Sequence, residues 1–173
     1  MHIANMMGTT LSFYGTLALI IAYILQSVVV SGDLASKRMA RMAAVQVMYW
    51  NDIAGEVVFP DCIDDFIWHF IRNEQEYEGI NLRFFRRLVG RFGNGMNFEE
   101  LLNKSMENDK GIHNLPVISL SIMKVAAIEM VFEKTDIPII INEYIEISKS
   151  FVDRGSAKLI NALLDRILKL VER

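Results

Sequence analysis

Three cations lie close together at the start of the stretch KRMARMAAVQVMYW, residues 37–50. In a helix, Lys37 and Arg41 are one turn apart and Arg38 lies beside them. All three can then project from the exposed first turns while the apolar side chains that follow are buried. Such a cluster could bind phosphate groups. The alternative is a solvated helix start, although the helix dipole disfavours cations at an N-terminus, so without an anionic ligand the cluster is an anomaly.

Few other residues have types and spacings suited to catalysis or metal binding. The single cysteine, Cys62, excludes an internal disulfide and favours a reducing compartment. The three histidines are far apart and form no ligand-spaced pair. Glu129 interrupts an apolar face, and we interpret it as part of a structural network because a catalytic carboxylate would need a second acid and a cleft. We therefore predict no enzymatic activity, no metal and no cofactor.

The composition is typical of one compact helical unit. Apolar residues make up 52% of the 173 residues, charged residues make up 23%, and there are three prolines. This length fits one domain, or two subdomains sharing a core. The net charge of −3 argues against a protein that coats nucleic acid through bulk electrostatics. Any RNA contact must therefore be local, and a weak local patch usually needs help from a second subunit.

The N-terminal region contains an uncharged run, LSFYGTLALIIAYILQSVVV, at residues 11–30. About 20 residues at about 1.5 Å each match the hydrocarbon core of a bilayer, so a membrane-spanning helix is one interpretation. No Lys or Arg precedes the run, as a secretory signal would require. The alternatives are a dispensable extension upstream of the natural start and an extra packed helix. We therefore divide the chain into an apolar extension, 1–32, and a folded domain, 33–173.

The folded domain is predicted to be all-α, with about seven helices, because apolar residues recur at helical spacing and no strand-type alternation is found. Asp33 is expected to cap a first helix running from about residue 34 to 50. Residues 115–133 are apolar around most of the helical circumference, which predicts a central helix. The other helices are expected near residues 60–75, 81–92, 98–108 and 138–152, and from 155 onwards.

Three blocks of sequence carry a family resemblance. They are KRMARMAAVQVMYW at 37–50, VISLSIMKVAAIEM at 117–130, and TDIPIIINEYIEISKSF with GSAKLINALLDRI over 135–167. In these blocks the chain resembles the bacterial transcription antitermination factor NusB family, over about residues 34–171. The resemblance implies two small helical bundles packed together. It also implies a cytoplasmic protein that binds boxA-type RNA as a heterodimer with the ribosomal protein NusE, and that joins RNA polymerase and other Nus factors.

The resemblance further implies which side chains contact RNA, since the family uses the first helix for phosphates and bases and the last helix to complete the groove. The expected RNA-binding residues are Lys37, Arg38, Arg41, Gln46, Tyr49, Lys158 and Asn161. Bases of a single strand would be splayed onto Gln46 and Tyr49. The alternatives are a hydrogen-bonded polar group for Gln46, a core aromatic for Tyr49 and a plain surface lysine for Lys158.

The last block departs from the family pattern in two places. Gly155 stands where an acidic residue is common, and Leu159 replaces a commonly aromatic residue whose stacking would be worth about 1–3 kcal/mol per base. Arg154 could compensate by adding charge. The TDIP turn also reaches INE about two residues sooner than is usual in the family. We expect Asn142 and Glu143 to tie helix ends to their neighbours rather than to act as an acid/base pair.

Two other functions remain open. A membrane-anchored helical interaction protein without an RNA function would account for the apolar run at 11–30. An RNA-modifying enzyme is the other, since some ribosomal RNA cytosine methyltransferases carry a NusB-like domain, but the chain has no glycine-rich cofactor loop. If NusE binds, the arginine-bearing helix at 81–92 and the start of the central helix are the faces expected to meet it.

Overall fold

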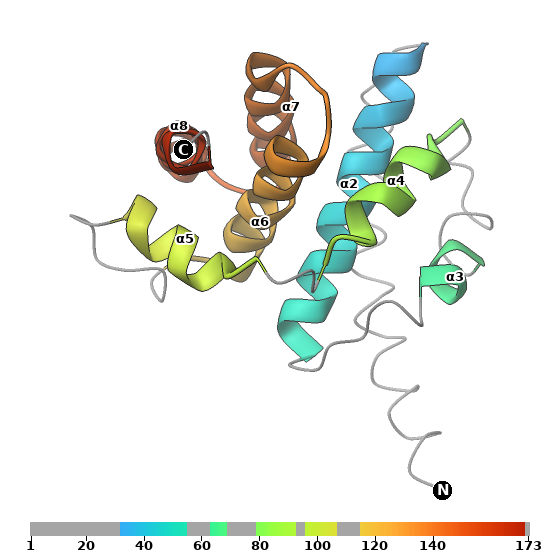
Figure 1. The fold of residues 1–173 in the computed structure, drawn as a ribbon, viewed down its shortest axis with the longest axis horizontal. Coiled ribbons are helices and arrows are strands. Elements are labelled where there is room, and N and C mark those ends of the chain that lie inside the picture. The colour runs from blue at the N-terminus through green and yellow to red at the C-terminus, as the bar shows by residue number, and fades with distance from the viewer. Residues whose placement is uncertain (1–31, 55–62, 69–78, 93–95, 107–114, 172–173) are drawn as a thin grey trace, which may run out of the picture.

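The computed structural model describes residues 32–54, 63–68, 79–92, 96–106 and 115–171. These ranges form helices joined by turns, without a strand, which confirms the all-α prediction (Figure 1). The helices are α2 (Asp33–Ala54), α3 (Ile63–Phe66), α4 (Leu82–Val89), α5 (Phe98–Ser105), α6 (Val117–Phe132), α7 (Ile137–Lys149) and α8 (Arg154–Val171). Six of them have at least two turns and α3 is a single turn, so the described ranges agree with the expectation of about seven helices.

The apolar run at residues 11–30 lies outside the described residues, and so do Pro60 and Phe70 of the expected second helix. Among the helices that are described, none combines the length and the apolar character needed to cross a bilayer.

Helix α2 packs along much of its length against α6 and α4. Its buried face is rich in small side chains, including Ala40, Ala43 and Ala44, which let neighbouring helices approach closely. The helix begins one residue earlier than expected, because Asp33 is its first helical residue and pairs with Lys37 one turn later instead of standing outside as a cap. At the other end it continues to Ala54, four residues beyond the expected end.

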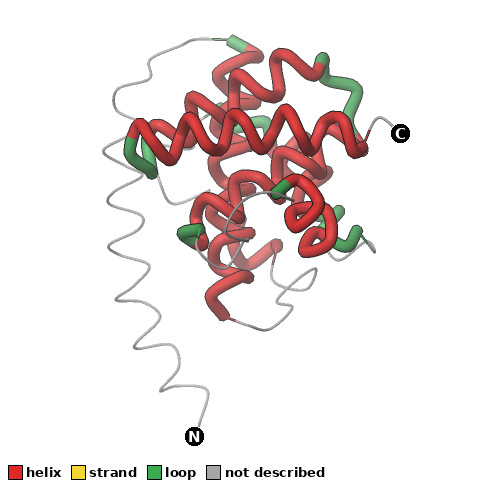
Figure 2. The backbone as a smooth tube through the Cα atoms, turned by 90° about the vertical axis from the view of Figure 1, so that its left-hand side faces the viewer, coloured by secondary structure: helices red, strands yellow, loops and turns green. Residues whose placement is uncertain are grey.

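Helix α6 is the central helix, as predicted. It packs against α2 and α4 on one side and against α7 and α8 on the other. In Figure 1, α2, α3 and α4 lie to the right of α6, while α5 and α8 lie to its left. Figure 2 shows α8 crossing the width of the molecule on the side opposite α2 and α4. The described helices therefore form two groups: a first group of α2, α3 and α4, and a second group of α5, α7 and α8. Helix α6 belongs to both groups.

Helices α4 and α5 are each capped at the N-terminus by an asparagine side chain. The Asn81 side chain accepts a hydrogen bond from the backbone N–H of Phe84 at 3.0 Å, and the Asn97 side chain accepts one from Glu100 at 3.0 Å. Such caps satisfy backbone donors that have no partner within the helix. In α7, Pro138 occupies the first turn, where its missing N–H costs nothing.

Two amphipathic patterns were predicted correctly. Helix α4 buries Phe84, Phe85, Leu88 and Val89 and leaves its arginines outside. Helix α8 buries a stripe that includes Ile160 and Leu164, and Lys158 and Lys169 are exposed. The aromatic ring of Phe66 on α3 stacks on Phe85 of α4 with 5.9 Å between ring centroids, so α3 is held against α4.

Candidate nucleic-acid interface

Two of the three cations at the start of α2 reach the surface, and both have carboxylate partners. The Lys37 ammonium lies 2.8 Å from the Asp33 carboxylate, and the lysine side chain is 36% exposed. Arg38 donates from Nε and Nη2 to the two carboxylate oxygens of Glu143 on α7, at 2.8 and 2.5 Å. These hydrogen bonds raise the pKa of Arg38 above its ordinary value, although partial burial opposes the shift. Arg38 is therefore held in one orientation at the edge of the surface.

The expectation that Arg41 projects into solvent is wrong. Its side chain is 1% exposed, and its Nε and Nη2 donate to the Glu129 carboxylate at 2.9 and 2.7 Å. Its guanidinium also lies over the Phe84 ring, 5.2 Å from the centroid. The reason is that α2 is covered by α4 and α6 from Ala40 onwards, so a cation one turn beyond Lys37 already faces the interior. In this arrangement Arg41 has no surface with which to touch RNA.

Arg41 belongs to a buried network that joins three helices. Glu129 of α6 is fully buried and also accepts a hydrogen bond from the Tyr144 hydroxyl at 3.0 Å. Arg41 Nη1 lies 3.5 Å from Glu143, the carboxylate that Arg38 also binds. The structural roles predicted for Glu129 and Glu143 are thus confirmed. Asn142 is exposed on α7 and makes no comparable contact with the described residues.

The network sets the ionisation of its own members. Burial alone would lower the pKa of Arg41, but the hydrogen bonds and charge of Glu129 outweigh it and the pKa is raised. Burial raises the pKa of Tyr144 well above its ordinary value, and the nearby Glu129 carboxylate adds to the shift. Both groups therefore keep their protons at neutral pH, with Arg41 charged and Tyr144 neutral.

Charges at the start of α2 balance closely. Lys37 faces Asp33, while Arg38 and Arg41 face Glu143 and Glu129. This corner of the molecule is consequently less positive than the sequence suggests. Of the three cations, Lys37 is the most available to an external anion. Its ion pair with Asp33, four residues earlier, is exposed, contributes little free energy and can be exchanged for another anion.

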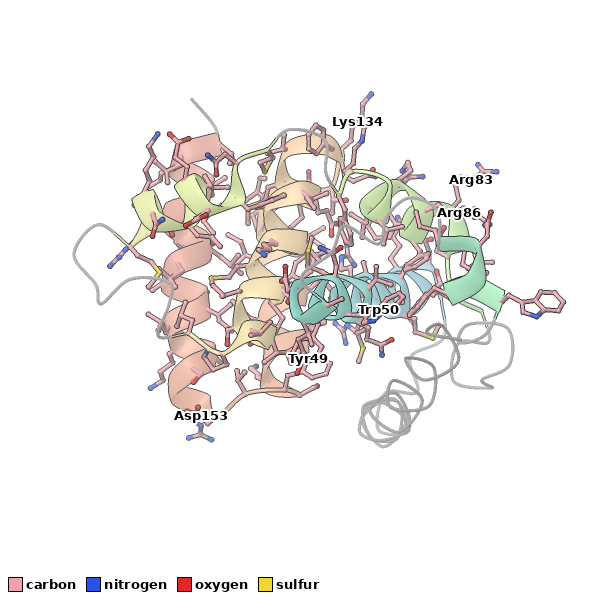
Figure 3. All side chains as sticks on the ribbon, turned by 90° about the horizontal axis from the view of Figure 1, so that it is seen from below. Tyr49, Trp50, Arg83, Arg86, Lys134 and Asp153 are labelled. Atoms are coloured by element: carbon pink, nitrogen blue, oxygen red, sulfur yellow. The ribbon has the colours of Figure 1, made fainter. Side chains whose placement is uncertain are left out.

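The remaining predicted RNA-binding residues are accessible. Gln46 and Tyr49 are half-buried on α2, Lys158 is exposed near the start of α8, and Asn161 is half-buried one turn later. Lys158 has no ion pair with the described residues. Figure 3 shows Tyr49 and Asp153, which immediately precedes α8, on the same side of the molecule. The structure thus places the end of α2 and the start of α8 on one face, with α6 and α7 between the two helices (Figure 1).

At the start of α8, Gly155 lies beside the Asp153 carboxylate, which caps the helix. The Asp153 carboxylate accepts hydrogen bonds from the backbone N–H groups of Gly155 and Ser156 at 2.7 and 3.1 Å, and from the Ser156 hydroxyl at 2.6 Å. The hydrogen bonds from Ser156 are the main reason why the pKa of Asp153 is lowered. A Cβ at position 155 would lie 3.0 Å from the Asp153 carboxylate, so any side chain there would crowd the cap. Asp153 supplies the acidic group at this helix start.

Sequence reasoning missed two features. The buried partners of Arg41 were not predicted, although the apolar neighbours on both sides of Arg41 are a signal that it faces the core. The second feature is a run of arginines on α4, since LRFFRRLVGRF at residues 82–92 contains four arginines and no acid. That helix was expected to meet a protein partner, and its positive charge was not taken as a sign of an anion-binding surface.

The helical architecture has a counterpart among solved structures. A structure of NusB from T. maritima superposes with a TM-score of 0.56 at 22% sequence identity, covering 76% of this chain and 89% of that one. The fold is therefore that of NusB proteins.

The sequence comparisons make the relationship more specific. The NusB family model matches residues 38–169. The transcription antitermination protein NusB of Bradyrhizobium diazoefficiens is 31% identical over 134 residues, which are 74% of this chain and 80% of the relative. The corresponding protein of Sinorhizobium fredii is 30% identical over 138 residues, 76% of this chain and 85% of the relative. The chain belongs to the NusB family.

Proposed function

We propose that this chain is a transcription antitermination factor that binds boxA-type single-stranded RNA together with the ribosomal protein NusE. Through that pair it would join RNA polymerase and other Nus factors. The observation that carries the proposal is the family match, because residues 38–169 include most of α2 and almost the whole of α8. Both candidate edges of the RNA site therefore lie in the region shared with NusB proteins, except for Lys37, which lies one residue outside it.

In this proposal the predicted RNA-binding residues have different tasks. Lys37 and Lys158 present exposed ammonium groups for backbone phosphates. Arg38 presents the outer part of a guanidinium that Glu143 holds in place, which limits the entropy lost on binding. Tyr49 offers a half-exposed ring for a base. Arg41 would act from beneath as a positioning residue, because it shares Glu143 with Arg38.

The charge balance at the start of α2 also supports a need for a second subunit. The chain has a net charge of −3, and its α2 cations are offset by carboxylates. Attraction of RNA by the chain alone is therefore weak, and a basic ribosomal protein beside it would supply the missing phosphate contacts. RNA binding should strengthen sharply when NusE is added.

The test is to measure binding of a boxA-type RNA by fluorescence anisotropy, with and without NusE, over a range of salt concentrations. Lys37→Glu and Lys158→Glu should each weaken binding and reduce the slope of log K against log[salt] by about 0.7 for each phosphate group that the variant no longer neutralises. Lys169→Glu is the matched control, since Lys169 is an exposed lysine near the other end of α8. Arg38→Glu is less informative because it would also place two carboxylates against each other. If Lys37→Glu and Lys158→Glu bind the RNA as tightly as Lys169→Glu does at the same salt concentration, the assignment is refuted.

A further inference from the structure

Helix α4 presents a stripe of arginines on the side of the molecule away from Tyr49 and the start of α8. Its apolar residues are buried, so Arg83, Arg86 and Arg87 are directed outwards. Figure 3 shows Arg83 and Arg86 on the side opposite Tyr49, and Lys134 lies on the same side as the two arginines. This surface therefore faces away from Tyr49 and from the start of α8, whereas the start of α4 adjoins the start of α2, where the Asn81 N–H donates to the Ser36 carbonyl at 3.1 Å.

The arginines of the stripe differ in how firmly they are held. Arg83 is exposed and has no ion pair with the described residues. Arg86 pairs with Asp64 at 2.8 Å, but the two side chains are 52% and 77% exposed, so the pair is weak and exchangeable. Arg87 donates to both carboxylate oxygens of Glu133 and lies over the Phe84 ring. Arg91 lies over the Phe132 ring at 4.9 Å.

These contacts connect the stripe to the end of α6. Glu133 and Phe132, which hold Arg87 and Arg91, immediately precede Lys134, and Lys134 is exposed. Five cations then lie along α4 and the end of α6, against the carboxylates of Asp64 and Glu133, with Asp136 two residues further along. Among the described side chains, this surface has five cations against three carboxylates, in a chain whose net charge is −3.

A large aromatic side chain lies just after α3, the helix beside this stripe. Helix α3 is held against α4 by the Asp64–Arg86 pair and by the stacked rings of Phe66 and Phe85. Trp68, two residues after Phe66, is 59% exposed, the most exposed large hydrophobic side chain in the described part of the chain. Cations and an exposed aromatic ring on neighbouring segments can bind a single-stranded nucleic acid, with phosphates on the cations and a base on the ring.

We propose that the α4 stripe, defined as Arg83, Arg86, Arg87, Arg91 and Lys134, forms with Trp68 a second track for single-stranded RNA. It would take nucleotides that flank the segment bound by α2 and α8, without sequence preference. This inference deepens the proposed function, because the RNA is the same transcript. RNA is favoured over an acidic protein because a single strand supplies both a row of phosphates for the cations and bases that can stack on the exposed Trp68 ring.

The test compares two RNAs in the presence of NusE. One is a boxA-type RNA of about 12 nucleotides, and the other carries about 10 additional uridines on each side. The unaltered chain should bind the longer RNA about tenfold more tightly or better. Arg83→Glu combined with Lys134→Glu, and separately Trp68→Ala, should remove most of this gain and leave affinity for the short RNA within about twofold. Lys169→Glu should retain the gain, and circular dichroism should show that all variants remain folded.

Other outcomes would overturn the inference. It is wrong if the unaltered chain gains nothing from the flanking uridines, or if the α4 variants gain as much as the unaltered chain. It is also wrong if the Arg83 and Lys134 changes abolish binding of polyglutamate but do not affect binding of the longer RNA. The stripe would then be a surface for an acidic protein. An oligouridine of about 20 nucleotides without boxA separates the two proposals. If the short boxA-type RNA does not bind, the proposed function is contradicted. If oligouridine still binds, and the Arg83 and Lys134 changes abolish that binding, the second track is supported even so.

Discussion

Four charged side chains meet where α2 packs against α6 and α7; three are buried, one is partly exposed, and their formal charges cancel. They are Arg38, Arg41, Glu129 and Glu143. Removing such charges from water is expensive, so a buried ion pair is weak support for high stability even when its geometry is good. Removing only one partner is different, since the remaining charge stays buried without compensation. We therefore interpret the network as a set of contacts that determines how α2 sits against α6 and α7, and not as a large contribution to the free energy of unfolding.

Arg41→Met tests this asymmetry. The substitution leaves the fully buried Glu129 carboxylate with only the Tyr144 hydroxyl as a partner, so we expect the free energy of unfolding to fall by about 3–5 kcal/mol. Urea denaturation followed by circular dichroism measures the change. The double variant Arg41→Met/Glu129→Leu removes both charges and should recover most of the loss. A double variant no more stable than Arg41→Met would mean that side-chain packing, rather than charge, is what Arg41 provides.

Tyr144 gives the network a signature at alkaline pH. The folded protein holds the phenol proton more tightly than the unfolded chain, whose tyrosine has a pKa of about 10.0. The stabilising contribution is therefore fully present below about pH 10 and is lost as the pH rises towards the higher pKa of the folded state. Tyr144→Phe should lower stability at neutral pH by about 1 kcal/mol through the lost hydrogen bond to Glu129, and should flatten the decline above pH 10. Urea midpoints of both proteins from pH 7 to 11 give the comparison, and parallel pH curves would contradict the prediction.

Asp33 restrains the cation that is best placed for RNA. Asp33→Asn frees Lys37 from its 2.8 Å ion pair, and because exposed pairs of this type are worth about 0.2–1 kcal/mol, RNA affinity should rise by about 1.4- to fivefold at low salt. The gain should shrink as salt is added. Glu100→Gln is a matched control, since it removes a similar i,i+4 ion pair, between Glu100 and Lys104 on α5. An equal gain in this control would show that overall net charge, not Lys37, is responsible.

At the scale of the elements, sequence patterns predicted the helices better than their surroundings. The alternation of apolar and charged residues in α4 and α8 sets their buried faces, and the nearly continuous apolar surface of α6 makes it central. The same patterns could not predict the role of Arg41, because its partner Glu129 is 88 residues away and the burial of α2 depends on how α6 packs against it. Local periodicity determines which face of a helix is apolar, whereas long-range packing determines which charged residues are enclosed.

Helix α4 has only eight residues, so its cap contributes a large part of its order. Asn81 caps the first turn through Phe84, and its backbone N–H also donates to the Ser36 carbonyl of α2 at 3.1 Å. Asn81→Ala removes the side-chain bond only and should cost about 1 kcal/mol, whereas Asn81→Asp should cost little. Hydrogen exchange should show faster exchange in the first turn of α4 in Asn81→Ala and unchanged exchange in α8. Unchanged exchange in α4 would mean that packing of Phe84 and Phe85 alone sets its order.

At the scale of the whole molecule, α2 is fastened to the second group of helices at both of its ends. Near its start, Arg38 and Arg41 bind carboxylates on α7 and α6. Near its end, the Asp52 carboxylate accepts hydrogen bonds from the Lys124 ammonium at 2.5 Å and from the Ser121 hydroxyl at 2.8 Å, both on α6. The two groups of helices thus share α6 and are cross-linked by polar contacts on each side of the apolar interface.

This arrangement predicts that the two groups unfold as one unit. In a Trp68→Phe variant, the remaining tryptophan is Trp50 on α2, so its fluorescence reports the first group of helices, while far-UV circular dichroism is dominated by the longer helices of both. The urea midpoints from the two signals should coincide, because α2 cannot leave α6 without exposing the Arg41–Glu129 pair. Asp52→Asn should weaken the contact at one end, lowering both midpoints together by an equal amount. Fluorescence that changes at a lower urea concentration than circular dichroism would instead show that the first group opens while α6, α7 and α8 stay folded.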